Sequence, residues 1–333
     1  MESPKPNKKM SGVVEIFQKD VPASKATIAF NLIKAQYSDA IEYRGIMDGV
    51  RGLLIFLGLA MLAMAGMVVV DSISFSVNAK SFSVSSLIIT IFAVGIFTPV
   101  GIFLFLWCVR LELFRPADEP IIFDRKNRKV YRIFREVQPG WRGLLKHWPL
   151  RSATYDWNLI DAEHHAVVNA NTSTVSRMHS LVFIVRQSPT DATVVDAFTL
   201  GGSMLLGEVT VAPMYEHVRK FMEDGGPHLS PGEVLSNREN PVTFLQCMAR
   251  MGPYGDTLKL WWAQAWVLTI IRFILFPISF PILTLLGIFS WFSYSTSIPI
   301  KWSDEVLAAV GPPVQFADQP STEASLRGTG TAS

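Results

Sequence analysis

The sequence predicts a membrane-anchored α+β protein: two N-terminal membrane-spanning helices, a small antiparallel β domain closed by one helix, and a late apolar segment. Three observations support this class. Residues 52–70 and 87–108 contain no charged side chain. Residues 118–226 form a series of short segments rich in β-branched and aromatic residues, which ends in a helical pattern. Residues 266–292 are again apolar, with Arg272 as their one charged residue.

The two N-terminal apolar blocks are 19 and 22 residues long. At about 1.5 Å of rise per helical residue, each covers a hydrocarbon core of about 30 Å. Neither block has a polar face, which disfavours the alternative of a buried helical hairpin in a soluble protein. Their interiors carry no ionisable group, so we interpret both helices as anchors, without an ion or proton pathway.

Residues 1–50 are predicted to be a cytoplasmic N-terminal segment. The first ten residues are polar, and we expect them to be disordered. Ile28, Leu32 and Tyr37 have weak helical spacing, and residues 39–47 are interpreted as a helix that leads into the first span. The apolar run begins only at Gly52, too far along the chain for a cleaved signal peptide, so we expect the first span to remain as an anchor.

Basic residues beside the spans predict the orientation, because short loops rich in Lys and Arg stay in the cytoplasm. The flanks of the two spans carry Arg44, Arg51, Arg110 and Arg115, whereas the connecting loop carries only Asp71 and Lys80. We therefore expect the loop to be external and both flanks cytoplasmic. The two cysteines, Cys108 and Cys247, are too few for a disulfide framework, which fits a reduced, cytosol-facing domain.

The central β domain is predicted over residues 118–226. Residues 121–123 and 129–134 are read as a hairpin with a polar turn. Further candidate strands are residues 153–157, 161–168, 180–186 and 193–200, giving five or six in all. A helical stripe follows, formed by Met214, Val218, Phe221 and Met222, with Pro213 in its first turn and Gly225-Gly226 at its end.

The C-terminal third is predicted as a linker with short helices over 227–260, a third membrane segment over 261–295 and a disordered tail over 296–333. Tryptophans lie towards both ends of the third segment, as in an aromatic belt. One tilted, proline-kinked span is the first interpretation, with Arg272 reaching to the cytoplasmic interface. The alternative is two half-length helices folded as a hairpin, because Pro277 and Pro281 stand where a turn would be.

No residue pattern indicates catalysis. His164 and His165 are adjacent in a predicted strand and point to opposite faces, which argues against a shared metal ion. Gly201-Gly202-Ser203 is not a nucleophile elbow, since Leu205 stands where a glycine is needed. There is no glycine-rich phosphate loop. We expect a protein that is not an enzyme and that has no metal, no cofactor and no nucleic-acid partner.

The candidate binding site is the basic turn of the first hairpin, formed by Arg125, Lys126, Arg128 and Lys129. Close to the membrane, such a cluster attracts anionic headgroups by about 1 kcal/mol per cation. The alternative is a solvated turn. Residues 152–240 hold 5 Lys/Arg against 11 Asp/Glu, so this part would face away from the bilayer and be available to a basic protein partner.

The run FDRKNRKVY at 123–131, the YDW at 155–157 that leads into a strand, and the closing helix resemble a bacterial pleckstrin-homology-like (GRAM-like) module. Together with the spans, they resemble a family of uncharacterised proteobacterial inner-membrane proteins, often encoded near type VI secretion genes. The resemblance implies a bacterial inner-membrane location. It also implies a role as an immunity protein against a membrane-directed toxin, or as a secreted partner of the secretion spike.

The leading hypothesis is therefore a non-enzymatic, multi-pass inner-membrane protein whose cytoplasmic domain binds a protein partner, plausibly as type VI immunity. The alternatives are a membrane-inserting, pore-forming effector and an adaptor that binds lipid headgroups. Membrane lipids and an unidentified protein are the expected partners. Whether the chain forms a homo-oligomer stays open.

Overall fold

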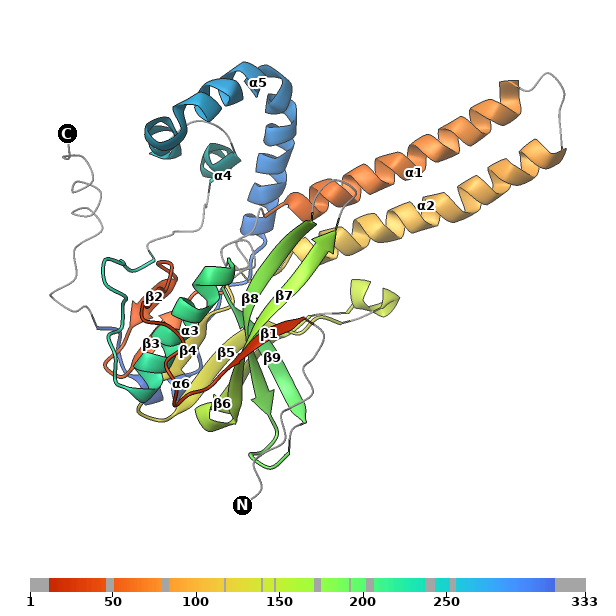
Figure 1. Cartoon of the computed structure of the whole chain (residues 1–333). Helices are drawn as coiled ribbons and strands as arrows, with labels where there is room; N and C mark the ends of the chain where they lie inside the picture. Colours follow the sequence, from red (N-terminus) through yellow and green to blue (C-terminus); the bar gives the residue numbers. More distant parts are fainter. Residues whose placement is uncertain are drawn as a thin grey trace.

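The computed structural model describes residues 12–45, 51–78, 84–116, 118–138, 140–146, 148–170, 175–191, 193–201, 207–236, 243–251 and 256–314. These residues form an α+β fold with two antiparallel sheets (Figure 1). Sheet A has the strand order β1-β7-β8-β9, and sheet B has the order β2-β3-β4-β5-β6.

The strands of sheet A are β1 (Val13–Phe17), β7 (Ile160–Ala170), β8 (Val175–Arg186) and β9 (Val194–Leu200). Those of sheet B are β2 (Ile33–Gln36), β3 (Ala40–Tyr43), β4 (Ile121–Asp124), β5 (Lys129–Arg135) and β6 (Leu150–Asp156). The α-helices are α1 (Leu53–Asn78), α2 (Val84–Glu112), α3 (Glu208–Glu223), α4 (Phe244–Met251), α5 (Asp256–Ser295) and α6 (Asp304–Val310). Two short 3₁₀ helices are η1 (Trp141–Leu144) and η2 (Trp157–Leu159).

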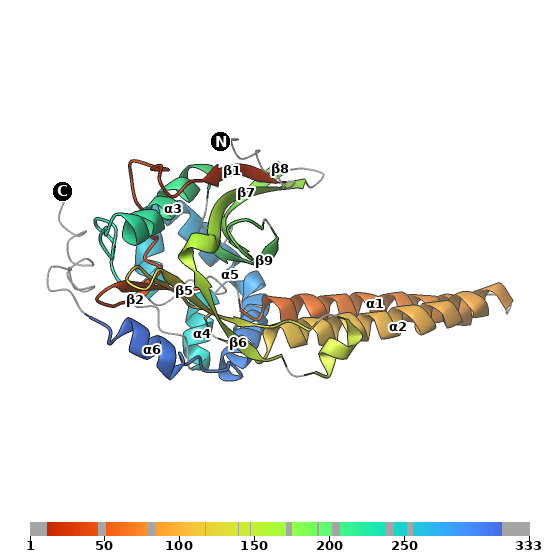
Figure 2. The same cartoon turned by 90° about the horizontal axis from the view of Figure 1, so that it is seen from below.

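The apolar hairpin α1–α2 is inserted into sheet B. Strand β3 leads into α1, β4 follows α2, and the two strands pair antiparallel, with Ala40 opposite Asp124 and Tyr43 opposite Ile121. Figures 1 and 2 show α1 and α2 side by side, projecting away from the β domain. Both ends of the hairpin are therefore held in neighbouring strands on the same side of any membrane that it enters.

Three helices are long and apolar enough to span a membrane: α1, α2 and residues 265–295 of α5. Helices α1 and α2 include the predicted blocks 52–70 and 87–108 almost entirely, and extend beyond them towards the connecting loop. Pro99 lies within α2, as expected. The apolar blocks are thus confirmed as helices.

The N-terminal segment is part of the β domain, not a separate unit. Residues 39–47 were expected to be helical, but Ala40–Tyr43 is strand β3, and residues 46–50 lie outside the described residues. The helical spacing around Leu32 does not mark a helix either, because residues 33–36 form strand β2. The predicted boundary at residue 118 leaves out β1, β2 and β3, whose pairing partners lie far along the sequence.

Sheet B is buried on both faces, which explains its short apolar strands. Ile121 and Phe123 face the main core, which they share with sheet A and α3. Ile122 faces a second cluster under α6, with Val306 and Val310. A strand covered on both sides reads as a continuous apolar run without alternation.

The domain is not a closed barrel in the part of the chain that the structure describes, since its nine strands fall into two separate sheets. The sheets meet at a corner where β6 passes through η2 into β7. Trp157 in η2 is buried there against Phe123, with ring centroids 6.1 Å apart. A further contact joins the two sheets, since Asp196 of β9 accepts hydrogen bonds from Arg132 and Tyr155 of sheet B.

Helix α3 closes the main core, as predicted, but it begins five residues earlier, so Pro213 lies inside the helix and not in its first turn. Its buried stripe contains Met214, Val218 and Phe221. Glu216 on the same helix is fully buried and bonds Arg219 at 2.8 Å, while the backbone N–H of Ala23 donates to it at 2.8 Å. This carboxylate therefore ties the N-terminal segment to α3.

The C-terminal tail is ordered where it returns to the domain. Residues 296–333 were expected to be disordered, but α6 packs on sheet B, and the N–H of Val314 donates to the carbonyl of Gln36 at 2.7 Å. The prediction of disorder is wrong for α6. Its apolar residues lie on one face, and this face is buried against sheet B, whose strands are far away in the sequence. Residues 315–333 and 1–11 lie outside the described residues.

We expect Glu216→Ala to lower the free energy of unfolding by about 3 kcal/mol, because it leaves the buried Arg219 without its main partner. Burial alone would raise the pKa of the Glu216 carboxyl, but the bonds from Arg219 and the Ala23 N–H overcome it and hold this pKa below its usual value. The stabilisation is then present above the unfolded-state pKa and is lost as the pH falls through the folded-state value.

Thermal unfolding of the purified chain in detergent, followed by tryptophan fluorescence at several pH values, measures this effect. Glu208→Ala, at an exposed position on the same helix, is the matched control and should cost less than about 1 kcal/mol. Equal losses for the two variants at neutral pH would show that the buried carboxylate does not hold the N-terminal segment.

Candidate functional site

The membrane end of the β domain is joined to α2 through Trp148, which is 1% exposed. Its ring lies between two guanidinium groups, with Arg135 of β5 at 4.3 Å and Arg110 of α2 at 5.2 Å from the centroid. Trp107 of α2 meets the same ring edge-on at 5.9 Å. The indole N–H donates to the carbonyl of Gly143 at 2.9 Å, which fixes η1 beside the helix.

Arg135 also donates hydrogen bonds to the carbonyl groups at the C-terminal end of α2. Its guanidinium donates to the carbonyls of Arg110, Leu111 and Leu113, at 3.2, 3.4 and 3.3 Å. The last carbonyls of a helix have no partner within it and carry partial negative charge, so a cation there is favourable. Strand β5 thus caps the helix that precedes β4.

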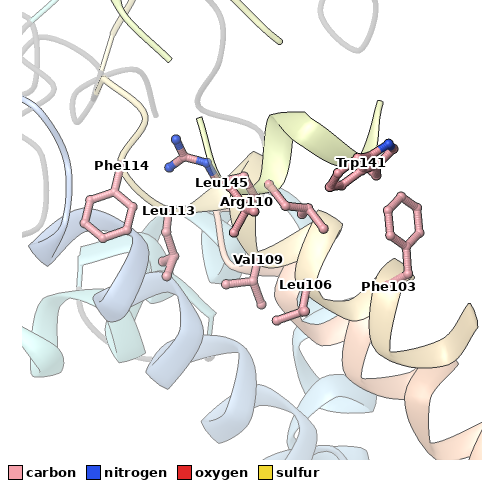
Figure 3. Close-up of a pocket in the computed structure, with 9 residues that line it drawn as sticks. Phe103, Leu106, Val109, Arg110, Leu113, Phe114, Trp141 and Leu145 are labelled. Atoms are coloured by element: carbon pink, nitrogen blue, oxygen red, sulfur yellow. The ribbon is translucent and has the colours of Figure 1, made fainter. Parts of the chain in front are cut away.

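A groove of about 470 Å³ lies along the outer side of this junction, between α2 and η1 (Figure 3). From α2 it is lined by Phe103, Leu106, Val109, Arg110, Leu113 and Phe114. From the η1 segment it is lined by Trp141, Leu144 and Leu145. Figure 3 shows Trp141 and Phe103 at one end of the groove and Phe114 at the other.

The outer wall of the groove exposes large apolar side chains. Trp141 is 63% exposed and Leu145 is 85% exposed. Both lie beside the last turns of α2, where a helix that leaves a bilayer passes the headgroup layer. Tryptophan is enriched at that depth, because its ring is apolar and its N–H is polar. The groove therefore matches the chemistry of the membrane interface.

Among the described residues, no carboxylate is ion-paired with Arg110 or Arg135. Burial lowers the pKa of Arg135 to about 10; the nearby charges of Arg110 and Arg115 act in the same direction, and the charge of Glu119 opposes them. Burial raises the pKa of the Glu119 carboxyl despite the charges of Arg132, Arg115 and Arg135. Positive charge therefore gathers at this junction.

The groove can hold an alkyl chain along its apolar wall and an anion at Arg110. The lining side chains that the structure describes include no Ser, Cys, His, Asp or Glu. The Nε atoms of Arg110 and Arg135 have no hydrogen-bond partner among the described residues.

The predicted site, at Arg125, Lys126, Arg128 and Lys129, lies elsewhere, in the turn between β4 and β5. Strand β4 leaves the membrane hairpin and β5 returns to it, so this turn is at the far end of both strands. Arg125 pairs with Asp39 at 3.0 Å, and Arg128 bonds Glu223 at 2.7 and 3.0 Å. Lys126 and Lys129 are exposed. A lipid-headgroup role for this turn stays a prediction.

The three histidines of sheet A, His164, His165 and His179, contact one another or an acid. His164 is buried, and its Nε2 lies 2.9 Å from Nδ1 of His179 on the neighbouring strand. His165 points to the other face and contacts Glu163 at 2.8 Å. Among the described residues, no three His, Cys, Asp or Glu side chains lie together as metal ligands.

The groove was not predicted from the sequence, because no element and no function were expected for residues 141–148, which form its second wall. The available signal was the pair Trp141 and Trp148 beside Lys146, about thirty residues after the end of a predicted span. Aromatic and basic residues together are typical of the membrane interface.

Comparison with known protein families shows to which family the chain belongs. A family model described as a family of unknown function (DUF6708) matches residues 98–309, more than half of the sequence. The chain belongs to this family. The match begins inside α2 and ends in α6, so it includes both walls of the groove. No curated protein and no solved structure matches the chain.

We expect Arg135→Met to loosen the segment 140–146 from α2, because it removes three bonds to helix carbonyls and one cation–π contact. A loss of about 1–2 kcal/mol corresponds to about five- to thirtyfold faster amide hydrogen exchange there. Hydrogen exchange of the detergent-solubilised chain, read by mass spectrometry, measures the change.

Arg151→Met is the control, because Arg151 is an arginine of the adjacent strand whose side chain is 62% exposed and whose ion pair with Glu136 lies at the surface. It should leave exchange in 140–146 unchanged. Equal protection in both variants would mean that Arg135 does not hold η1 in place.

Proposed function

We propose that this member of DUF6708 is a non-enzymatic integral membrane protein that binds an anionic phospholipid in the groove between α2 and η1. The groove itself carries the proposal: an apolar wall on the flank of a membrane helix includes Arg110, for which the described residues supply no carboxylate ion pair. An acyl chain fits the wall, and a headgroup phosphate complements Arg110.

The position of the β domain supports this proposal. Because α1–α2 is inserted between the paired strands β3 and β4, the domain is joined to the membrane hairpin at two points. Its η1 segment stays at the depth of the lipid headgroups. A site of this kind recognises lipid in the plane of the membrane, without extracting it, and would make the protein a membrane adaptor.

The orientation of the proposed adaptor rests on basic residues at the base of the hairpin. Arg44, Arg51, Arg110 and Arg115 all lie on the side of the β domain, which favours a cytoplasmic domain in a bacterial inner membrane.

We expect Arg110→Gln to weaken the preference for phosphatidylglycerol over phosphatidylcholine about fivefold, the equivalent of about 1 kcal/mol for one cation near the headgroups. The chain is reconstituted in nanodiscs that contain brominated lipid of either headgroup, and quenching of tryptophan fluorescence is measured. Leu106→Trp, which fills the groove without changing its charge, should reduce lipid retention in native mass spectrometry.

The control is the double variant Lys126→Gln/Lys129→Gln, which removes two exposed cations from the β4–β5 turn. It should behave as the unmodified chain. If it loses the lipid preference and Arg110→Gln does not, the turn is the lipid site and the groove is not.

A second candidate function, binding of a protein partner as in type VI immunity, is favoured by the edge of sheet A. In the described part of the chain β9 pairs with β8 alone. Val195 on this strand is 60% exposed and Val194 is 42% exposed. An exposed, apolar edge strand is a template for strand addition by another chain.

Val195→Lys should block such pairing without disturbing the buried face of β9. In cells that express a toxin encoded beside this gene, the unmodified chain should protect, and the variant should protect at least tenfold less in surviving colonies. An unmodified chain that gives no protection, or that itself depolarises the membrane, contradicts the immunity hypothesis.

A further inference from the structure

Helix α5 is the third apolar segment, and both of its flanks are attached to the same β domain. Before it, the N–H of Ser236 donates to the carbonyl of Ile33 in β2 at 2.7 Å. The Glu233 carboxylate accepts from the N–H groups of Ala29 and Phe30, at 2.8 and 2.7 Å. The chain is thus held on sheet B shortly before α4.

After α5 the chain is held on the same sheet. The N–H of Ile298 donates to the carbonyl of Arg115 at 3.3 Å. Further on, α6 packs against Ile122 and Tyr131 of sheet B. The C-terminal end of α5 itself sits at the base of the hairpin, where Ser293 bonds Glu112 of α2 at 2.9 Å.

The short helix α4 also lies beside the C-terminal part of α5. Phe244 of α4 meets the ring of Trp291 edge-on at 6.4 Å. A Cβ added at Gly287 would collide with Sδ of Met248, so the two helices approach closely there. The segment that leads into α5 therefore starts next to the place where α5 ends.

These contacts exclude a single crossing. A segment that crosses a bilayer once has its two ends on opposite sides, whereas both ends of α5 are tied to one domain. We infer that α5 is a re-entrant element: it dips into one leaflet of the bilayer and returns to the side of the β domain. The inference needs only that α1–α2 spans the membrane, and it holds whether or not the groove binds lipid.

The shape and length of α5 agree with this inference. Figure 1 shows α5 curving into an arch, and Figures 1 and 2 show it running across the base of α1 and α2, not alongside them. Pro277 and Pro281 lie within the arch, and Ala265 has non-helical dihedrals. Proline bends a helix by removing an internal hydrogen bond. Residues 266–276 cover about 17 Å and residues 282–295 about 21 Å, both short of about 30 Å.

Under this inference, lipid covers the exposed surface of α5. Its outward side chains are large and apolar, among them Ile274, 70% exposed, and Ile278, 75% exposed. In the central part they surround the helix and do not gather on one face, and a protein partner covers one face only. Just before α1, Gly52 lies against Phe289 and Ser290, which brings the start of α1 and the end of α5 together.

Accessibility of introduced cysteines tests the crossing number. In a chain with Cys108→Ala and Cys247→Ala, the single variants Lys259→Cys, Lys301→Cys and Lys80→Cys are treated with a membrane-impermeant maleimide in right-side-out and inside-out vesicles. Lys259, in the first turn of α5, and Lys301, after its end, are both exposed, and Lys80 lies in the α1–α2 connection. Positions 259 and 301 should react from one face and position 80 from the other. Reaction of 259 from the same face as 80 would overturn the inference.

A nitroxide label tests what covers the arch. At Ile274, the label should collide with oxygen as frequently as one at Met64, a 62% exposed position on α1, and should be shielded from a water-soluble nickel chelate. High collision with the chelate would place the arch in water. Spin–spin broadening between labelled chains would mean that a second copy covers it. Either result would overturn insertion into a leaflet.

Discussion

The pairing of β3 with β4 is the constraint on which the rest of this structure depends. Neighbouring antiparallel strands lie about 5 Å apart, so the chain enters and leaves the α1–α2 hairpin through two adjacent strands of one sheet. Helices that start this close together must run side by side. They do so with small residues at the contact, since a Cβ at Gly58 would press on Cys108 and one at Gly101 on Ala65. The β domain is consequently part of the membrane anchor and not a tethered appendage.

This constraint gives the basic residues at the base of the hairpin a second role. By sequence they predict which side stays in the cytoplasm. In the structure Arg51 donates to the carbonyls of Pro116 and Ser293 and stacks on Tyr294 at 4.6 Å, so it joins α1, α5 and the chain that enters β4. Arg110 and Arg135 do the same for α2 and β5. Residues that a topology rule treats as interchangeable charges thus make specific structural contacts, and the groove between α2 and η1 lies beside Arg110 and Arg135.

The sequence predicts the elements whose partners are near in the chain. The apolar helices, the β4–β5 hairpin and the apolar stripe of α3 all follow from local patterns. Strands β1, β2 and β3 do not, because each has only four or five residues, and two of them pair across about 80 to 150 residues, Ala40 with Asp124 and Val13 with His165. The basic turn was chosen for its charges alone. The partners that hold Arg125 and Arg128, Asp39 and Glu223, come from segments whose position only the fold reveals. The groove was missed for the same reason, since its walls are some thirty residues apart.

Composition and length also leave the path of α5 undetermined, because an apolar helix of 31 residues fits one crossing as well as a folded excursion. The attachment of the two ends of α5 distinguishes these two paths. Sheet B holds the chain at Ser236 and again at Ile298 and α6, and α4 sits between α5 and the domain. The family match supports treating these parts together, as it runs from α2 through α6. It leaves out β2 and β3, however, and without β3 the strand β4 would lose its neighbour and the main core would lose Ile41 and Tyr43. The folding unit must therefore include residues before the match as well as within it, with the membrane hairpin lying between two parts of one sheet.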